Sequence, residues 1–184
     1  FRGKTYLQLW TGLSEKPFFG RDFYGNFYVY GKMYRQGFFN VYKDENIKKF
    51  ALKLNLKPVF KAYYAPPVIS LHVPFTFLNR KTATRLYFIL NHMWLFLTIL
   101  VMNRIFIQGK KWKESLMLTA GMFLFFLLFS PVIDNLFSGQ INLLLTFLFS
   151  LFLYFYHKDR LVPASLFLAL AINVKYFPLF VIPV

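Results

Sequence analysis

Four long apolar runs in the second half of the chain constrain its fold more than any other feature. Each comes close to or exceeds the roughly 20 apolar residues that a helix needs to cross a bilayer. Hydrophobic residues make up 57% of the chain, whereas a soluble domain averages about 45–50%. The runs predict an all-α polytopic membrane protein with transmembrane helices at about 86–107, 116–133, 139–156 and 161–184.

A shorter apolar segment, 66–79, precedes these runs and is broken by proline. Its 14 residues would extend only about 21 Å as a helix. That is less than the roughly 30 Å hydrocarbon core of a bilayer. We therefore expect a membrane segment that does not cross, within a membrane part of residues 64–184. A crossing segment is the alternative.

Residues 1–63 contain no run long enough to span a bilayer and are predicted to form a first extracytoplasmic loop. Aromatic residues recur at helical spacing before a stop signal at Gly37, and a basic amphipathic helix follows, with Asp44 as its cap. Such helices are typical of juxtamembrane elements lying in the bilayer interface. A small soluble domain packed on its aromatic residues is the alternative. The residues concerned are Phe23, Phe27, Tyr30 and Tyr34, then Ile47 and Phe50.

The chain carries a formal net charge of +15 and has no cysteine. Residues 1–63 hold 12 Lys and Arg against 4 Asp and Glu. In a membrane protein this surplus favours anionic lipid headgroups over nucleic acid as the partner. Because the chain starts without Met and stops inside an apolar run, we expect N- and C-terminal parts of the full protein to be missing.

The arrangement of basic residues predicts which polar groups share one side of the membrane. If 66–79 does not cross, Asp22 and the polar stretch 134–142 lie on one side, and the basic cluster 104–113 lies on the other. The positive-inside rule then places Asp22 outside. The crossing alternative puts the basic cluster outside, against that rule, although the basic residues of 80–85 argue weakly in its favour.

Three positions could carry chemistry. Asp22 opens an aromatic stretch, where apolar surroundings would raise the pKa of its carboxyl and suit it to act as a general base; an exposed helix cap is the alternative. Lys175 lies within the last apolar run, where an ionisable residue is a functional candidate that could hold a phosphate; snorkelling to the headgroups is the alternative.

The third position is the polar stretch between two apolar runs, with Asp134, Gln140 and Asn142. Amides here could bind a hydroxyl-rich ligand or bond neighbouring helices, and a plain turn is the alternative. The three histidines have no ligand spacing, so neither a metal site nor a cofactor is expected. No glycine-rich phosphate loop is present.

Four motifs together resemble glycosyltransferase family 87, polytopic enzymes of the GT-C superfamily that use polyprenyl-phosphate sugars. The first motif is Asp22-Phe23 followed by Phe27-Tyr28, Gly37 and Tyr42. The others are Tyr64-Ala-Pro-Pro67 with Pro74, Ser130-Pro131 leading to Gly139-Gln-x-Asn142, and Lys175 with Pro178.

This resemblance implies a GT-C-like fold and an inverting transfer of a sugar, a mannose-like hexose being favoured, from a polyprenyl-phosphate donor. The acceptor would be an extracytoplasmic glycan or glycolipid at the cell membrane. Asp22 would be the catalytic base. The predicted substrate-binding residues are Tyr28, Tyr64, Asp134, Gln140, Asn142 and Lys175.

Two other classes of protein remain open. A transporter or lipid flippase would use Asn91, His92 and Lys175 to line a path, and it predicts an internal repeat. A non-catalytic membrane scaffold would leave Asp22 and Lys175 without a shared role.

Overall fold

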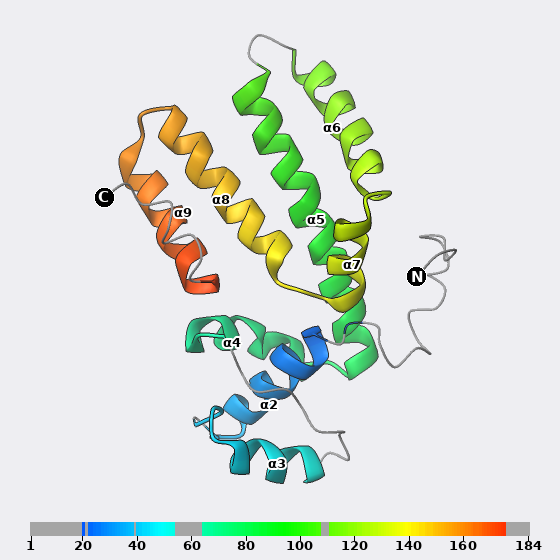
Figure 1. The fold of residues 1–184 in the computed structure, drawn as a ribbon, viewed down its shortest axis with the longest axis vertical. Helices are drawn as coiled ribbons and strands as arrows, with labels where there is room; N and C mark the ends of the chain where they lie inside the picture. Colours follow the sequence, from blue (N-terminus) through cyan, green and yellow to red (C-terminus); the bar gives the residue numbers. More distant parts are fainter. Residues whose placement is uncertain (1–19, 21, 39, 54–63, 108–110, 176–184) are drawn as a thin grey trace.

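The computed structural model describes residues 20, 22–38, 40–53, 64–107 and 111–175, and all regular structure in this part of the chain is helical (Figure 1). Four longer helices form a bundle: α5 (Arg80–Phe106), α6 (Trp112–Phe126), α8 (Asn142–His157) and α9 (Leu161–Val174). Shorter helices gather beyond one end of it, and we call them the short helices: η1 (Phe23–Tyr28), α2 (Val29–Arg35), α3 (Asp44–Lys53), α4 (Pro66–His72) and η2 (Val73–Phe77). The prediction of an all-α fold is confirmed.

Helix α5 is the axis of the bundle, since it packs against both α6 and α8. It starts where the side chain of Asn79 accepts a 2.9 Å hydrogen bond from the backbone N–H of Thr82, an N-cap that satisfies a free donor of the first turn. Its 27 residues extend about 40 Å. Among the described residues it is the one unbroken helix that is long and apolar enough to cross a membrane.

The predicted span 116–133 is wrong as a single helix. The chain there forms α6 and a separate helix α7 (Ser130–Ser138), bent from each other by 79°. Proline at position 131 explains the break, because it offers no N–H to the preceding turn and its ring collides with the carbonyl four residues back. Residues 134–138 are therefore helical, and the predicted turn is confined to the residues around Gly139.

The helices in the last two predicted spans also begin or end at other residues than expected. Helix α8 begins at Asn142 rather than at 139, and α9 ends at Val174, so Lys175 follows the helix instead of lying inside it. Lys175 has extended backbone angles, φ −151° and ψ 140°. Pro178, which lies outside the described residues, follows at a spacing typical of helix ends.

The short helices have a core of their own, in which Tyr30 and Met33 of α2 pack against Ile47 and Phe50 of α3. Gly37, with φ +83°, follows the end of α2, so the predicted stop signal is confirmed. The apolar face of α3 is thus covered by protein, as in the packed-domain alternative. The location of residues 1–63 at a membrane interface stays a prediction.

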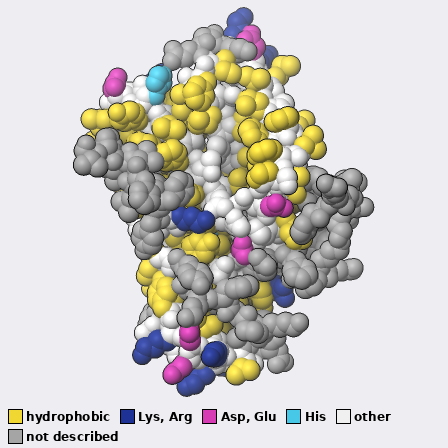
Figure 2. Space-filling view, in the orientation of Figure 1, with side chains coloured by type: hydrophobic (Ala, Val, Ile, Leu, Met, Phe, Trp, Pro, Cys, Tyr) yellow, Lys and Arg dark blue, Asp and Glu magenta, His cyan; other side chains and the backbone are white. Residues whose placement is uncertain are grey.

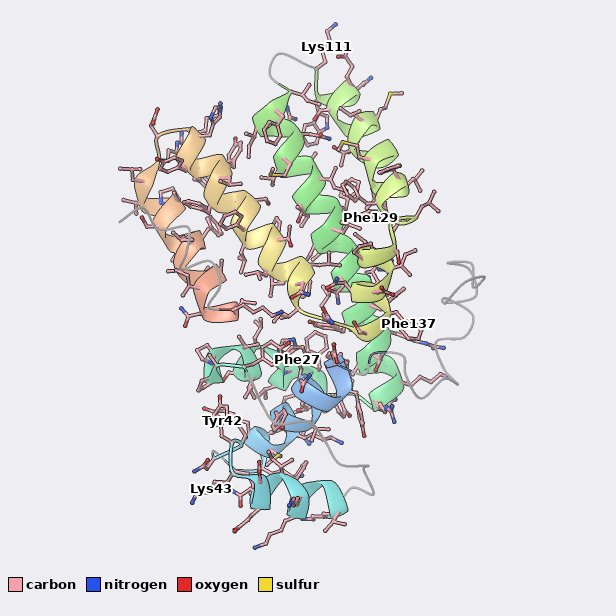
Figure 3. The ribbon with its side chains drawn as sticks, in the orientation of Figure 1. Phe27, Tyr42, Lys43, Lys111, Phe129 and Phe137 are labelled. Atoms are coloured by element: carbon pink, nitrogen blue, oxygen red, sulfur yellow. The ribbon has the colours of Figure 1, made fainter. Side chains whose placement is uncertain are left out.

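Segment 66–79 forms α4 and η2, which lie across the end of the bundle rather than alongside α5 (Figure 1). The end of α5, the start of α6 and the α8–α9 connection lie at the far end of the bundle (Figure 1). In Figure 3, Lys111 and Lys43 mark the two opposite ends of the molecule, and Phe27 and Phe137 lie between them. We call the region where the bundle meets the short helices the junction.

Candidate functional site

The junction brings the segment around Asp22 against the glycine turn that follows α7. The backbone N–H of Gly20 donates a 2.8 Å hydrogen bond to the carbonyl oxygen of Phe137. Gly139 has φ +70°, and a Cβ there would lie 2.8 Å from Cβ of Phe23 and 3.3 Å from Cα of Gly20. Only glycine suits both this backbone conformation and this close approach.

Asp22 directly precedes η1 and is half-buried. Its side chain makes no capping hydrogen bond to η1, which removes the main argument for reading it as a helix cap. The next residue, Phe23, is fully buried and stacks on Tyr87 of α5 with ring centroids 4.3 Å apart. The aromatic packing of η1 therefore fixes where the Asp22 backbone lies.

Lys175 reaches the same junction from the end of α9. Its ammonium group donates a 2.6 Å hydrogen bond to Oδ1 of Asn142, the first residue of α8. The amide nitrogen of Asn142 in turn donates to Oδ1 of Asn135 at 2.7 Å and to Oε1 of Gln140 at 2.5 Å. These four side chains, from α7, α8, the end of α9 and the turn between α7 and α8, form what we call the amide network.

Asp22 interacts electrostatically with Lys175 and with Tyr64. Its segment packs against the turn that leads into α8, and Lys175 bonds the first residue of α8. Partial burial lowers the pKa of Lys175, and the negative charge of Asp22 opposes this shift. Burial raises the pKa of Tyr64, and the charge of Asp22 raises it further. The junction therefore pairs a carboxylate with an ammonium group in partly desolvated surroundings, where each charge has a strong effect on a ligand.

Aromatic rings form the wall of the junction beneath Asp22. The ring of Phe27 packs between Tyr64, at a centroid distance of 4.7 Å, and His72 of α4, at 4.2 Å. His72 is buried, which lowers its pKa to about 4, and its Nδ1 lies 2.7 Å from the carbonyl oxygen of Val68. The imidazole is therefore neutral at physiological pH and serves as part of the wall.

Besides Tyr64, two predicted binding residues are not part of the amide network. The carboxylate of Asp134 is exposed and, among the described residues, bonds no member of the network. The hydroxyl of Tyr28 donates a 2.7 Å hydrogen bond to the carbonyl oxygen of Leu78, which joins η1 to the start of α5. Direct contact of either side chain with a substrate stays a prediction.

Asn135 belongs to the network, although the sequence indicated only an ordinary turn former at that position. Its amide nitrogen donates to the carbonyl oxygen of Pro131 at 2.8 Å, which directs its oxygen toward Asn142. The spacing of seven residues between Asn135 and Asn142 is the one sequence signal that could have indicated the pair.

The polar residues in the middle of α5 bond within their own helix. Nδ2 of Asn91 donates to the carbonyl oxygen of Tyr87 at 3.0 Å, and Nδ1 of His92 lies 2.7 Å from that of Phe88.

Among the described residues, no group of three His, Cys, Asp or Glu side chains could hold a metal ion.

The architecture defines an all-helical protein with a membrane-length helix and a charged, amide-rich site where the helix ends converge. The model of glycosyltransferase family 87 matches residues 62–184, more than half of the chain. The chain therefore belongs to glycosyltransferase family 87. The match includes Tyr64, the amide network and Lys175 but not Asp22. No curated protein and no solved structure matches the chain.

Proposed function

We propose that this chain is the part of a polytopic membrane glycosyltransferase that holds a polyprenyl-phosphate sugar, a mannose-like hexose being favoured, for transfer to an extracytoplasmic glycan or glycolipid. The observation that carries this proposal is that the segment of Asp22 packs against the turn leading into α8, that Lys175 bonds the first residue of α8, and that the charge of Asp22 acts on Lys175. Transfer from a sugar phosphate needs a base near the acceptor hydroxyl and a cation near the leaving phosphate. The two side chains supply one group each.

The proposed reaction is a single displacement with inversion at the sugar. The acceptor hydroxyl gives its proton to the carboxylate of Asp22, and its oxygen forms a bond to C1 of the sugar. The bond from C1 to the phosphate oxygen breaks, and its electron pair leaves with the polyprenyl phosphate. The ammonium group of Lys175 offsets the negative charge that develops on that oxygen.

The surroundings of the site support a donor that comes from the bilayer. Figure 2 shows hydrophobic side chains over much of the bundle, with acidic and basic side chains near the junction. Such a surface suits helices in lipid with their polar groups at the two ends, and the lipid-linked phosphate would reside at the junction. The far end of the bundle carries exposed basic residues, Lys111 and Lys113 at the start of α6 and Lys158 and Arg160 between α8 and α9. By the positive-inside rule that end faces the cytoplasm, so the junction faces outward.

Tyr64 and Gln140 complete the proposed donor site. Tyr64 lies beside Asp22 and packs on Phe27, so it could stack on or hydrogen-bond the sugar. Within the described part of the chain the amide nitrogen of Gln140 makes no hydrogen bond, since only its oxygen joins the amide network, so this nitrogen could donate to a hydroxyl or a phosphate oxygen. Tyr28 and Asp134 are proposed only as outer contacts, because the structure gives them no link to Lys175.

A polytopic transporter or flippase is the second proposal. Asn91 and His92, which would line its path, each bond a carbonyl oxygen one turn back in α5, while Lys175 and the amide network lie at one end of the bundle. These observations favour the transferase.

Sugar transfer by the full-length protein in membranes tests the proposal. Radiolabelled polyprenyl-phosphate hexose and pentose would be offered beside nucleotide sugars. We expect transfer from a polyprenyl-phosphate sugar and a loss of about 10²–10³-fold in Lys175→Met, by analogy with removal of one oxyanion donor. The control is Lys158→Met, at an exposed lysine in the α8–α9 connection. Transfer from nucleotide sugars alone would contradict the proposal.

A further inference from the structure

The side-chain amide of Asn142 uses both of its N–H donors, and its oxygen accepts one hydrogen bond, within the protein. A primary amide offers two N–H donors and one oxygen acceptor. Both donors of Asn142 are used, one to Asn135 and one to Gln140, and its oxygen accepts from Lys175. Asn142 therefore has no donor left for a ligand, although it lies in the middle of the site.

The orientation of the Asn142 and Asn135 amides is fixed by the groups that they bond at the two ends of the network, Lys175 and the carbonyl of Pro131. Lysine has donors only, so Asn142 must turn its oxygen toward Lys175 and its nitrogen toward the other two amides. Asn135 is fixed in the matching sense, because its own nitrogen donates to the backbone carbonyl of Pro131 at 2.8 Å. The hydrogen bonds are therefore donated in one direction, from the ammonium group of Lys175 through Asn142 and Asn135 to the backbone carbonyl of Pro131 in α7.

This direction determines which groups the site presents to a ligand. The oxygens of Asn135, Gln140 and Asn142 all accept hydrogen bonds within the network. The N–H groups of the network that remain are two on Lys175, those of Gln140 and one on Asn135. These donors and the charge of Lys175 suit an anion with several acceptor oxygens, such as a phosphate.

Lysine is a flexible side chain that loses considerable rotamer entropy when it is held in one place. A charge-assisted hydrogen bond of 2.6 Å to a rigidly held amide restricts it before a ligand arrives. We infer that Asn142 is a positioning residue, which acts through Lys175 by holding its ammonium group in place for the phosphate of the donor. This inference rests on the proposed function for the identity of the anion, but not for the coupling between the two residues.

A double-mutant cycle on sugar transfer tests the coupling. We expect Asn142→Leu to lower kcat/KM for the polyprenyl-phosphate sugar by roughly 10–100-fold, within the range of a lost hydrogen bond to a charged group. In a Lys175→Met background the same substitution should have little further effect, since residues that act as a unit are not additive. The matched control is Asn173→Leu, at an exposed asparagine of α9 that bonds only a carbonyl of its own helix.

A second measurement does not depend on the reaction. Lys175 in the full-length protein would be modified with an amine reagent at mildly alkaline pH and quantified by peptide mass spectrometry. The oxygen of Asn142 favours the charged ammonium, as does Asp22, so Asn142→Leu should make Lys175 several-fold more reactive, whereas Asn173→Leu should not.

The results of the two experiments distinguish the positioning role of Asn142 from the proposed function. Changed reactivity of Lys175 without any transfer by the wild type would reject the proposed function and keep the positioning role. Transfer with unchanged Lys175 reactivity, or with fully additive losses in the cycle, would overturn the positioning role and keep the function.

Discussion

The hydrogen bond from the backbone N–H of Gly20 to the carbonyl oxygen of Phe137, 2.8 Å long, joins two segments that lie far apart in the sequence. Gly20 lies two residues before Asp22, and Phe137 lies two residues before Gly139. The bond therefore sets the position of the acidic segment relative to the amide network.

The close approach at Gly139 predicts a strong effect of a single methyl group. Gly139→Ala places a Cβ 2.8 Å from Cβ of Phe23 in a left-handed backbone conformation. We expect it to lower the free energy of unfolding by about 1–3 kcal/mol, seen as a lower thermal unfolding midpoint in detergent. The control is Gly121→Ala in α6, where a Cβ would meet nothing within 4 Å and a better helix former replaces glycine. Equal midpoints for the two variants would contradict the assigned contact.

Two tyrosines allow a comparison of how much a tyrosine hydroxyl contributes to the free energy of unfolding with and without a hydrogen-bond partner. The hydroxyl of Tyr87 is buried and makes no well-formed hydrogen bond among the described residues, although the side chain of Asn91 lies near it, whereas that of Tyr28 bonds the carbonyl oxygen of Leu78. Tyr28→Phe should cost about 1 kcal/mol, and Tyr87→Phe should cost nothing or stabilise slightly. Chemical denaturation of both variants in the same detergent measures the difference. A clear loss for Tyr87→Phe would show that its hydroxyl has a partner.

Burial of His72 predicts a pH dependence of stability. Its pKa is about 4 in the folded protein and about 6.5 in an unfolded chain, so the unfolded state binds the proton first as the pH falls. The contribution of His72 to stability is complete above pH about 6.5 and is lost as the pH falls toward 4. The total loss is about 3 kcal/mol.

Thermal unfolding of the wild type and His72→Gln between pH 7 and pH 4 measures this contribution. The variant should lose less stability over that range than the wild type, whereas His157→Gln, at an exposed histidine that ends α8, should behave as the wild type does. Parallel pH profiles for the wild type and His72→Gln would contradict the neutral, buried imidazole.

The sequence predicted those features that depend on local pattern. The helical spacing of Phe23, Phe27 and Tyr30 and the stop at Gly37 are confirmed, because residue periodicity and backbone preference act over a few residues. The break between α6 and α7 was not predicted, although Pro131 is visible. Both sides of the break are apolar, and membrane helices tolerate proline when neighbours satisfy the freed backbone groups.

The sequence indicated the residues of the amide network better than the hydrogen bonds among them. Gln140, Asn142 and Lys175, which the sequence singled out, lie in the amide network, as does Asn135, which was read only as a turn former. A substrate contact for Asp134 and for each of the three stays a prediction. Because residues 134 and 135 are helical, their side chains project about 100° apart, so one faces Asn142 while the other faces outward. Only the tertiary packing of α7 against α5 decides which one.

Sugar transfer by Asp22→Asn in the full-length protein, with folding and membrane insertion verified, tests whether Asp22 is the base. The control is Glu114→Gln, an exposed acid at the far end of the bundle. If Asp22 is the base, transfer should fall by about 10²–10⁴-fold, while the control keeps wild-type activity. Transfer at the wild-type rate by Asp22→Asn would contradict the account and place the base elsewhere.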